Sequence, residues 1–159
     1  MLDPRLLTHE ALIKTICSET HHVDLCLSTL KSDPLSFTTD CLGLTKITIN
    51  ATTKTSDDIT NYVKRLYCDA KAGRTKSAIA DCVELYKDVK DQFGNAVKDL
   101  NAGDDAGANA NVSAALTDGE TCKDGFDEAG AGLPGGLQTL GVHFLDLCSV
   151  VLSMINHLK

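Results

Sequence analysis

The chain of 159 residues contains no tryptophan, only three prolines and only 4% aromatic residues. It also lacks any cluster of basic residues: 15 lysines and arginines stand against 22 aspartates and glutamates, so the formal net charge is −7. Because an acidic chain repels phosphate backbones, we expect no nucleic-acid partner. An acidic surface instead suits a basic protein partner, although it also simply favours solubility.

No apolar run approaches the ~18 residues that cross a bilayer. The N-terminus does not show the basic-then-apolar pattern of a signal peptide. We therefore expect no membrane span, and either a cytosolic protein or a mature secreted protein with an added methionine. Polar residues interrupt the most apolar segment, 142–158, at His143, Asp146, Ser149, Ser153, Asn156 and His157.

Few prolines, few aromatics and few β-branched runs favour an all-α fold. Between residues 77 and 100, apolar residues recur every three or four positions, which predicts one long amphipathic helix. The same spacing between residues 137 and 158 predicts another, after the glycine-rich loop 130–136. The alanine-rich segment 105–126 predicts a thin helix that packs closely against its neighbours.

Residues 34–70 predict a further long helix, with Leu35 and Val63 among its inward residues. Serine and threonine crowd its stretch 48–60, so a kink or a frayed stretch could occur there. Residues 9–33 predict a hairpin of two short helices. Short connections make long helices antiparallel neighbours. The sequence thus predicts a single domain over 1–159, an up-down four-helix bundle at 34–159 that follows the helical hairpin.

The chain is unusually rich in cysteine, with seven residues. An odd number leaves at least one sulfur unpaired within the chain. Cys17 and Cys26 flank the predicted hairpin turn and suit a disulfide there. Cys82 and Cys122 each lie about 20 residues from the turn near Gly103, so antiparallel helices place them at one height. Spacing therefore favours two disulfides, and a reduced cytosolic protein with seven thiols is the alternative.

The remaining cysteines, Cys41, Cys68 and Cys148, are expected to be free thiols. Cys41 and Cys68 fall near opposite ends of one predicted helix, ~40 Å apart, far beyond the ~7 Å between Cα atoms that a disulfide allows. Cys148 lies on the apolar side of the last helix, where a thiol packs as a small hydrophobic group.

The contexts of these cysteines resemble the plant invertase and pectin methylesterase inhibitor family over essentially the whole chain. The resemblance implies a secreted plant protein with a four-helix bundle, disulfides Cys17–Cys26 and Cys82–Cys122, and a free Cys148. Cys41 and Cys68 depart from the family pattern, and an exposed thiol there could link two chains as a homodimer. The strings that carry the resemblance are Ser32-Asp33-Pro34, Cys82 with Glu84 and Tyr86, Asn109 with Ser113 to Leu116, Thr121-Cys122 with Asp124 and Phe126, and Leu145-Asp146-Leu147-Cys148.

The same resemblance implies an inhibitor that is not an enzyme and needs no cofactor. Members of the family bind 1:1 over the active-site cleft of pectin methylesterase, or they block acid invertase in the cell wall or the vacuole. Cell-wall invertase inhibitors carry a Pro-Lys-Phe motif after the helix that corresponds to residues 77–100, where this chain has Gly103-Asp104-Asp105-Ala106-Gly107. Pectin methylesterase in the cell wall or apoplast is therefore the favoured target, and acid invertase is the alternative.

Matched positions in the family give five candidate partner-binding residues. Three of them are acids at helical positions i, i+4 and i+7, off the apolar side, where they would complement a basic rim on an enzyme. A merely solvated acidic side is the alternative interpretation. The five candidates are Glu84, Asp88, Asp91, Asn109 and Thr121.

Two Asn-x-Ser/Thr sequons, at Asn50 and Asn111, fit a secreted protein and predict glycosylation. A glycan at Asn111 would lie beside the predicted binding surface.

Other classes of protein are less well indicated. A di-iron bundle needs two Glu-x-x-His pairs on facing helices, whereas the sequence has one, from Glu19 to His22, in the hairpin turn, and we predict no metal site. No flanking sequence marks a cysteine nucleophile. A small-ligand-binding helical protein is the remote alternative, and the alanine-rich segment favours close packing over a cavity.

Overall fold

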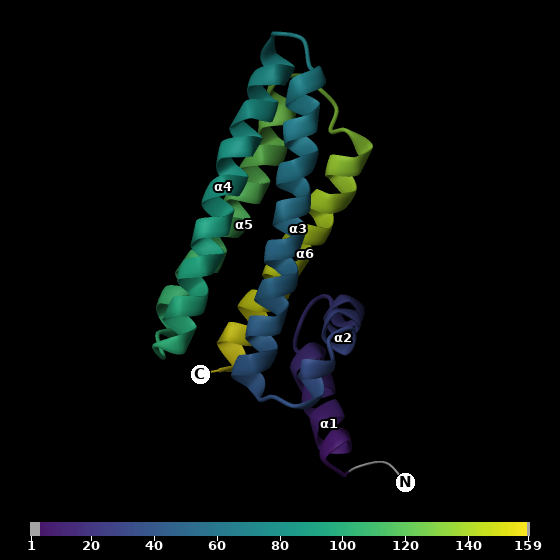
Figure 1. Cartoon of the computed structure of the whole chain (residues 1–159), viewed down its shortest axis with the longest axis vertical. Helices are drawn as coiled ribbons and strands as arrows, with labels where there is room; N and C mark the ends of the chain where they lie inside the picture. The colour runs from purple at the N-terminus through teal and green to yellow at the C-terminus, as the bar shows by residue number, and fades with distance from the viewer. Residues whose placement is uncertain (1–3, 159) are drawn as a thin grey trace.

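Four long helices form in the segments where apolar residues recur every three or four positions. They are α3 (Cys41–Asp69), α4 (Arg74–Asn101), α5 (Asp105–Glu128) and α6 (Gly135–His157). The computed structural model describes residues 4–158. In it the four helices form a ring, in which α3 and α5 each contact both α4 and α6 (Figure 1). The predicted all-α, up-down four-helix bundle is confirmed.

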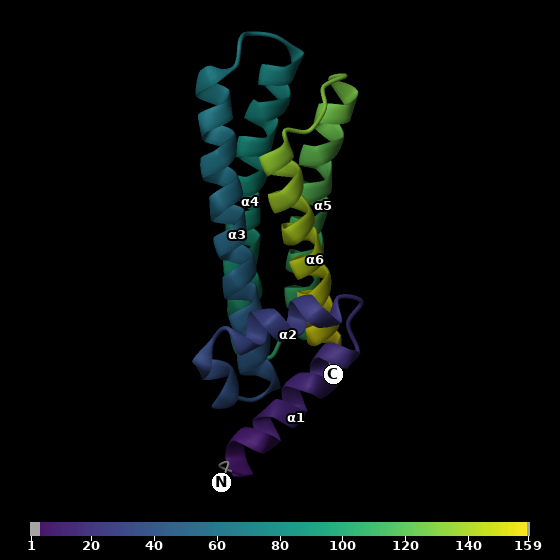
Figure 2. The ribbon, with the colours of Figure 1, turned by 90° about the vertical axis from the view of Figure 1, so that its right-hand side faces the viewer.

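Two short helices, α1 (Pro4–Ser18) and α2 (Val23–Lys31), form the predicted N-terminal hairpin. Helix α1 begins earlier than the predicted start at residue 9, with a proline in its first turn, where proline is well tolerated. The predicted disulfide Cys17–Cys26 joins the two helices, with its Cα atoms 5.5 Å apart. Figure 2 shows α2 lying across the lower ends of α3 and α6, with α1 below it.

The hairpin is fixed to the bundle by polar contacts and by a small second core. The carboxylate of Glu19 lies 2.8 Å from Nδ1 of His157, and its carbonyl oxygen accepts a hydrogen bond of 3.2 Å from Ser153 Oγ. These contacts join segments 134 and 138 residues apart along the chain. The second core consists of Ile13, Ile16, Cys17, Cys26, Leu30, Leu44, Val150 and Met154.

The first long helix begins at Cys41 and not at residue 34, so that part of the prediction is wrong. Pro34–Phe37 forms a separate 3-10 turn, η1, capped by the side chain of Asp33. Asp40 is extended, and its carboxylate accepts a backbone hydrogen bond of 3.0 Å from Gly43 N–H and so caps α3. Leu35, predicted to face inward, is 63% exposed because it belongs to this turn and not to the apolar side of α3.

The threonine-rich stretch of α3 is an unbroken helix, so the kink or fraying considered from the sequence does not occur. Thr48, Thr52 and Ser56 are buried, and their hydroxyls donate to backbone carbonyl oxygens of the preceding turn at 2.7 to 3.0 Å. Because each buried hydroxyl has this partner, the stretch lines the bundle interior without an unpaired donor. Low helix propensity misleads here because tertiary packing overrides it.

Helix α4 is tied to both α5 and α6. The disulfide Cys82–Cys122 joins α4 to α5, with Cα atoms 4.8 Å apart. Phe144 of α6 packs edge-on against Tyr86 and Phe93 of α4, with ring centroids 5.3 and 6.2 Å apart. The pairing predicted from equal helix heights is therefore confirmed, and it lies beside the aromatic centre of the core.

Gly119 sets the separation of α5 and α6. A Cβ atom at this position would lie 2.9 Å from Phe144 Cε2 and 3.1 Å from Leu145 Cδ2, and the Phe144 ring is fully buried. We expect Gly119→Ala to lower the free energy of unfolding by about 1–3 kcal/mol, measured by urea denaturation.

Gly125→Ala in the same helix is the matched control for this substitution, because its Cβ atom would meet nothing within 4 Å. For Gly125→Ala we expect the free energy of unfolding to rise by about 0.5–1 kcal/mol, because alanine has the better helix propensity. A gain at both positions would contradict the close packing of α5 on α6.

Helix α6 is the one helix among the described residues that is long and apolar enough to cross a membrane by length and composition. The core helix of a packed bundle has the same length and composition, so the expectation of no membrane span stays a prediction. In this fold α6 packs against α3 and α5, with Phe144, Leu147 and Val151 buried.

The three remaining cysteines are unpaired, as predicted. Cys41 is partly buried at the start of α3, Cys68 is exposed near the end of the same helix, and Cys148 is buried in the core. Burial, with a smaller contribution from the charge of Glu120, raises the pKa of the Cys148 thiol. Cys148 therefore stays protonated and acts as a packing group.

Candidate functional site

The three predicted acids Glu84, Asp88 and Asp91 are all exposed on α4. Their spacing keeps them off the buried side of the helix, as the sequence predicts. Lys87 pairs with Glu84 at 3.8 Å, whereas Asp88 and Asp91 form no ion pair with any residue that the structure describes. Two of the three carboxylates are thus free to meet a cation on a partner.

Helix α5 adds an acid that the sequence analysis does not single out. Asp118 accepts a hydrogen bond of 3.1 Å from Gln92 Nε2 of α4. Partial burial raises the pKa of Asp118, the bond from Gln92 lowers it, and the negative charge of Asp88 raises it again, so that the net shift is upward. We call the surface formed by Glu84, Asp88, Asp91 and Asp118 the acidic face.

The sequence does contain a signal for Asp118. It lies one helical turn before Cys122, so the disulfide to α4 turns this side of α5 toward α4. An acid at that position must therefore lie close to the acids of α4.

The upward pKa shift of Asp118 gives stability a pH dependence. The folded-state pKa lies above the ordinary unfolded value, so the charged form weakens the fold at pH above both values. Stability is then gained as the pH falls through the range between them. Protonation also adds a donor near Gln92, whose Oε1 atom is buried without a partner among the described residues.

We expect Asp118→Asn to raise the free energy of unfolding at pH 7 and to reduce the gain on acidification. Urea denaturation at neutral and at mildly acidic pH measures both effects. Asp124→Asn, at an exposed position on the same helix, is the matched control and should follow the wild type. If the free energies of unfolding of wild type and Asp118→Asn differ by the same amount at both pH values, the pKa of Asp118 is not raised.

The other two predicted residues lie on different sides of α5. Thr121 is exposed just after Asp118, beside the acidic face, and its hydroxyl donates to the Thr117 carbonyl oxygen at 2.9 Å. Asn109 lies about two and a half turns before Asp118, which places it on the opposite side of the helix. Its Oδ1 atom accepts a bond of 3.5 Å from Ser113 Oγ. The structure therefore gathers four of the five predicted residues on one surface and leaves Asn109 apart.

The two sequons differ in their surroundings. Asn50 is exposed on α3. The side-chain nitrogen of Asn111, which would carry the glycan, donates to Asp99 Oδ2 at 2.7 Å and to the Gly107 carbonyl oxygen at 3.2 Å. A glycan at Asn111 would have to replace these bonds, and glycosylation stays a prediction at both positions.

The turn between α4 and α5 is short and capped. Gly103 adopts a φ of 77°, in the left-handed region that favours glycine. The carboxylate of Asp104 accepts a bond of 2.8 Å from the Gly107 N–H and so caps α5. This turn presents acidic side chains and carries neither a cation nor an aromatic ring.

Among residues 4–158, no group of three or more histidine, cysteine, aspartate or glutamate residues could hold a metal ion. The single Glu-x-x-His string instead joins the hairpin to α6. Glu19 lies against His157, and His22 Nε2 lies 3.5 Å from Asp146.

Comparisons with known proteins agree with the resemblance. The sequence matches the family described as plant invertase/pectin methylesterase inhibitor over residues 11–154. A pectinesterase inhibitor from Actinidia deliciosa is 32% identical over 153 residues, which cover 96% of this chain and 82% of the relative. A provisionally named invertase inhibitor from Platanus acerifolia is 37% identical over 105 residues, 66% of this chain and 59% of the relative.

The fold also matches a solved structure. A crystal structure of a mutant form of a pectin methylesterase inhibitor from Arabidopsis superposes with a TM-score of 0.79 at 25% identity, covering 91% of this chain and 95% of that one. The chain therefore belongs to the plant invertase/pectin methylesterase inhibitor family.

Proposed function

We propose that this chain is a protein inhibitor of pectin methylesterase, not an enzyme, and that it binds 1:1 over the active-site cleft of its target. The observation that carries the proposal is the similarity to the pectinesterase inhibitor from Actinidia deliciosa, which spans 96% of this chain. The fold supports it, because two disulfides and four packed helices present a preformed surface that loses little freedom on binding.

The acidic face supports the choice of contact surface. The unpaired carboxylates of Asp88 and Asp91 suit basic groups on a partner, which would speed association and fix the orientation of the complex. Thr121 lies beside them as an exposed hydroxyl. Asn109 belongs to the proposed contact set only if the enzyme also reaches the other side of α5.

Acid invertase is the second candidate target, because the provisionally named invertase inhibitor from Platanus acerifolia matches 66% of this chain. Cell-wall invertase inhibitors insert a Pro-Lys-Phe motif into the sucrose pocket. Here the same turn is held by Gly103 and the Asp104 cap, and it offers neither the cation nor the aromatic ring of that motif. This difference favours pectin methylesterase.

We further propose that the protein acts outside the plasma membrane, in the plant cell wall. Its two disulfides support this location, because disulfides persist in oxidising compartments and are rare in the cytosol.

Paired inhibition assays against purified plant pectin methylesterase and acid invertase test the choice of target. We expect the chain to abolish methylesterase activity and to leave invertase activity unchanged. The same chain, reduced and alkylated, controls for effects of added protein. Inhibition of invertase alone would transfer the proposal to the second target, and inhibition of neither enzyme would contradict both.

A further inference from the structure

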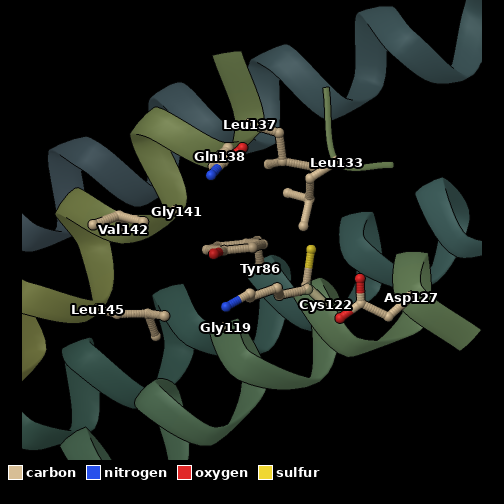
Figure 3. A pocket seen from close by; sticks show the side chains of 11 residues that line it. Tyr86, Gly119, Cys122, Asp127, Leu133, Leu137, Gln138, Gly141, Val142 and Leu145 are labelled. Atoms are coloured by element: carbon tan, nitrogen blue, oxygen red, sulfur yellow. The ribbon is translucent and has the colours of Figure 1, made fainter. Parts of the chain in front are cut away.

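A pocket of about 270 Å³ lies between α5 and α6, on a different side of α5 from the acidic face. An engineered protein cavity of ~150 Å³ binds benzene, so this pocket has room for a molecule larger than one aromatic ring. Apolar side chains form much of its wall, namely Leu133, Leu137, Val142 and Leu145 (Figure 3).

The absence of a side chain at Gly141 leaves room for this pocket, and the sequence alone does not reveal that room. Ala108 and Ala115 of α5 are fully buried, as close packing predicts, but the expectation that close packing leaves no cavity is wrong on the side of α5 that faces α6. Gly119 lets Phe144 and Leu145 of α6 approach α5 closely, whereas Gly141 contributes no side chain to the space beside them. A Cβ atom at Gly141 would meet nothing within 4 Å.

Tyr86 supplies an unpaired hydrogen-bond donor to the pocket. The residue is only 2% exposed, and Figure 3 shows its ring lying across the pocket between α6 and α5. Its hydroxyl bonds to no residue that the structure describes, and it lines the pocket. Burial raises the pKa of this phenol, so the hydroxyl keeps its proton. The hydroxyl is not among the buried polar atoms that lack a partner, so it faces the open space of the pocket, where an acceptor atom of a ligand can take its hydrogen bond.

Lys123 adds a positive charge to the same pocket. It is exposed and forms no ion pair with any described residue, although it lines the wall together with Gln138 and Asp127. In Figure 3 the carboxylate of Asp127 lies on the other side of Cys122 from the Tyr86 hydroxyl. Tyr86 and Lys123, which both line the pocket, therefore offer a donor and a positive charge to an anionic acceptor.

We propose that this pocket binds a small monocarboxylate with an apolar body about the size of an aromatic ring. The body contacts the leucines and Val142, and the carboxylate accepts the Tyr86 hydrogen bond and pairs with Lys123. A single lysine balances a single carboxylate charge, which favours this class over the more highly charged phosphates. The site goes beyond the proposed inhibitory function and does not depend on it, because it lies away from the acidic face.

Fluorine NMR titration of the oxidised full chain with 3-(4-fluorophenyl)propanoate, and separately with its primary amide, tests the proposal. We expect the acid to bind about tenfold more tightly than the amide, since hydrogen bonds to charged groups are the stronger ones. Tyr86→Phe keeps the ring that packs on Phe144 and should weaken binding of the acid about fivefold. Lys123→Gln should lower the affinity for the acid to that for the amide.

Gly141→Leu should abolish binding, because Gly141 lines the pocket, a Cβ atom there meets nothing within 4 Å, and the remaining atoms of leucine would occupy the ligand's space. Gly94→Leu is the matched control. It is an exposed glycine of α4 whose Cβ atom also meets nothing within 4 Å, and its variant should bind as the wild type does. Circular dichroism verifies that each variant is folded.

The proposal is overturned if the chain binds neither probe, if it binds acid and amide equally, or if Gly141→Leu leaves the affinity unchanged. Lys123 is exposed, so Lys123→Gln does not disturb the core. The charge test therefore stands even if the pocket-filling variant is unstable.

Discussion

Replacing Glu84, Asp88 and Asp91 together with lysine is expected to weaken the complex with pectin methylesterase about 100-fold, since like charges across an interface cost several kcal/mol. All three carboxylates are exposed, and Asp88 and Asp91 lack an ion-pair partner among the described residues. Glu84 should contribute least, because Lys87 already lies 3.8 Å away. Most of the loss should fall on the association rate and should shrink at high salt.

Inhibition constants measured over a range of salt concentrations check this expectation. The matched control replaces Glu10, Asp24 and Asp58 with lysine. These acids are exposed on α1, α2 and α3, and the variant has the same net charge as the test variant. We expect the control to inhibit nearly as the wild type does. Equal losses in both variants would show an effect of net charge alone, and no loss in either would remove the acidic face from the interface.

Removal of the Cys82–Cys122 disulfide by a double substitution to alanine is expected to lower the free energy of unfolding by about 4 kcal/mol. The bond joins residues 40 apart in sequence, so it restricts the unfolded chain strongly. Alanine avoids a buried hydroxyl at these positions, which are 0% and 3% exposed. A loss of this size should lower the melting temperature by about 8–16 °C.

The Cys17–Cys26 pair, 9 residues apart, is the internal comparison. Its double substitution to alanine should cost about 2.5 kcal/mol because the closed loop is shorter. Urea denaturation of both variants measures the two losses. A larger loss at Cys17–Cys26 would show that local packing outweighs the restriction of the unfolded chain.

Helix positions and disulfide pairing could be predicted because both follow from spacing. The apolar period places α4 and α6 within a few residues of their observed bounds. Equal distances of Cys82 and Cys122 from one turn place the two sulfurs at one height. Both features can be predicted from the geometry of a single helix or of two antiparallel helices.

The predictions for α3 were wrong at features that depend on a single capping residue or on packing between helices. The start of α3 depends on Asp40 as a cap, and the periodic pattern does not distinguish that start from residue 34. The buried threonines of α3 contradict their helix propensity because the bundle interior accepts hydroxyls that bond to their own helix.

The candidate site was only partly accessible from sequence for a similar reason. Helical spacing places Glu84, Asp88 and Asp91 on one exposed side. The position of Asn109 came from resemblance, which supplies residue types but not the side of the helix they occupy. Asp118 and the pocket at Tyr86 depend on how α4, α5 and α6 pack together.

The central claim is that this chain inhibits pectin methylesterase as a bound partner, and an activity titration tests it most directly. A plant pectin methylesterase, held at a concentration well above the dissociation constant, is titrated with the folded, oxidised chain. We expect a linear fall of activity that ends at one chain per enzyme molecule, with both proteins eluting together in gel filtration. Full activity in a large molar excess of the chain would contradict it.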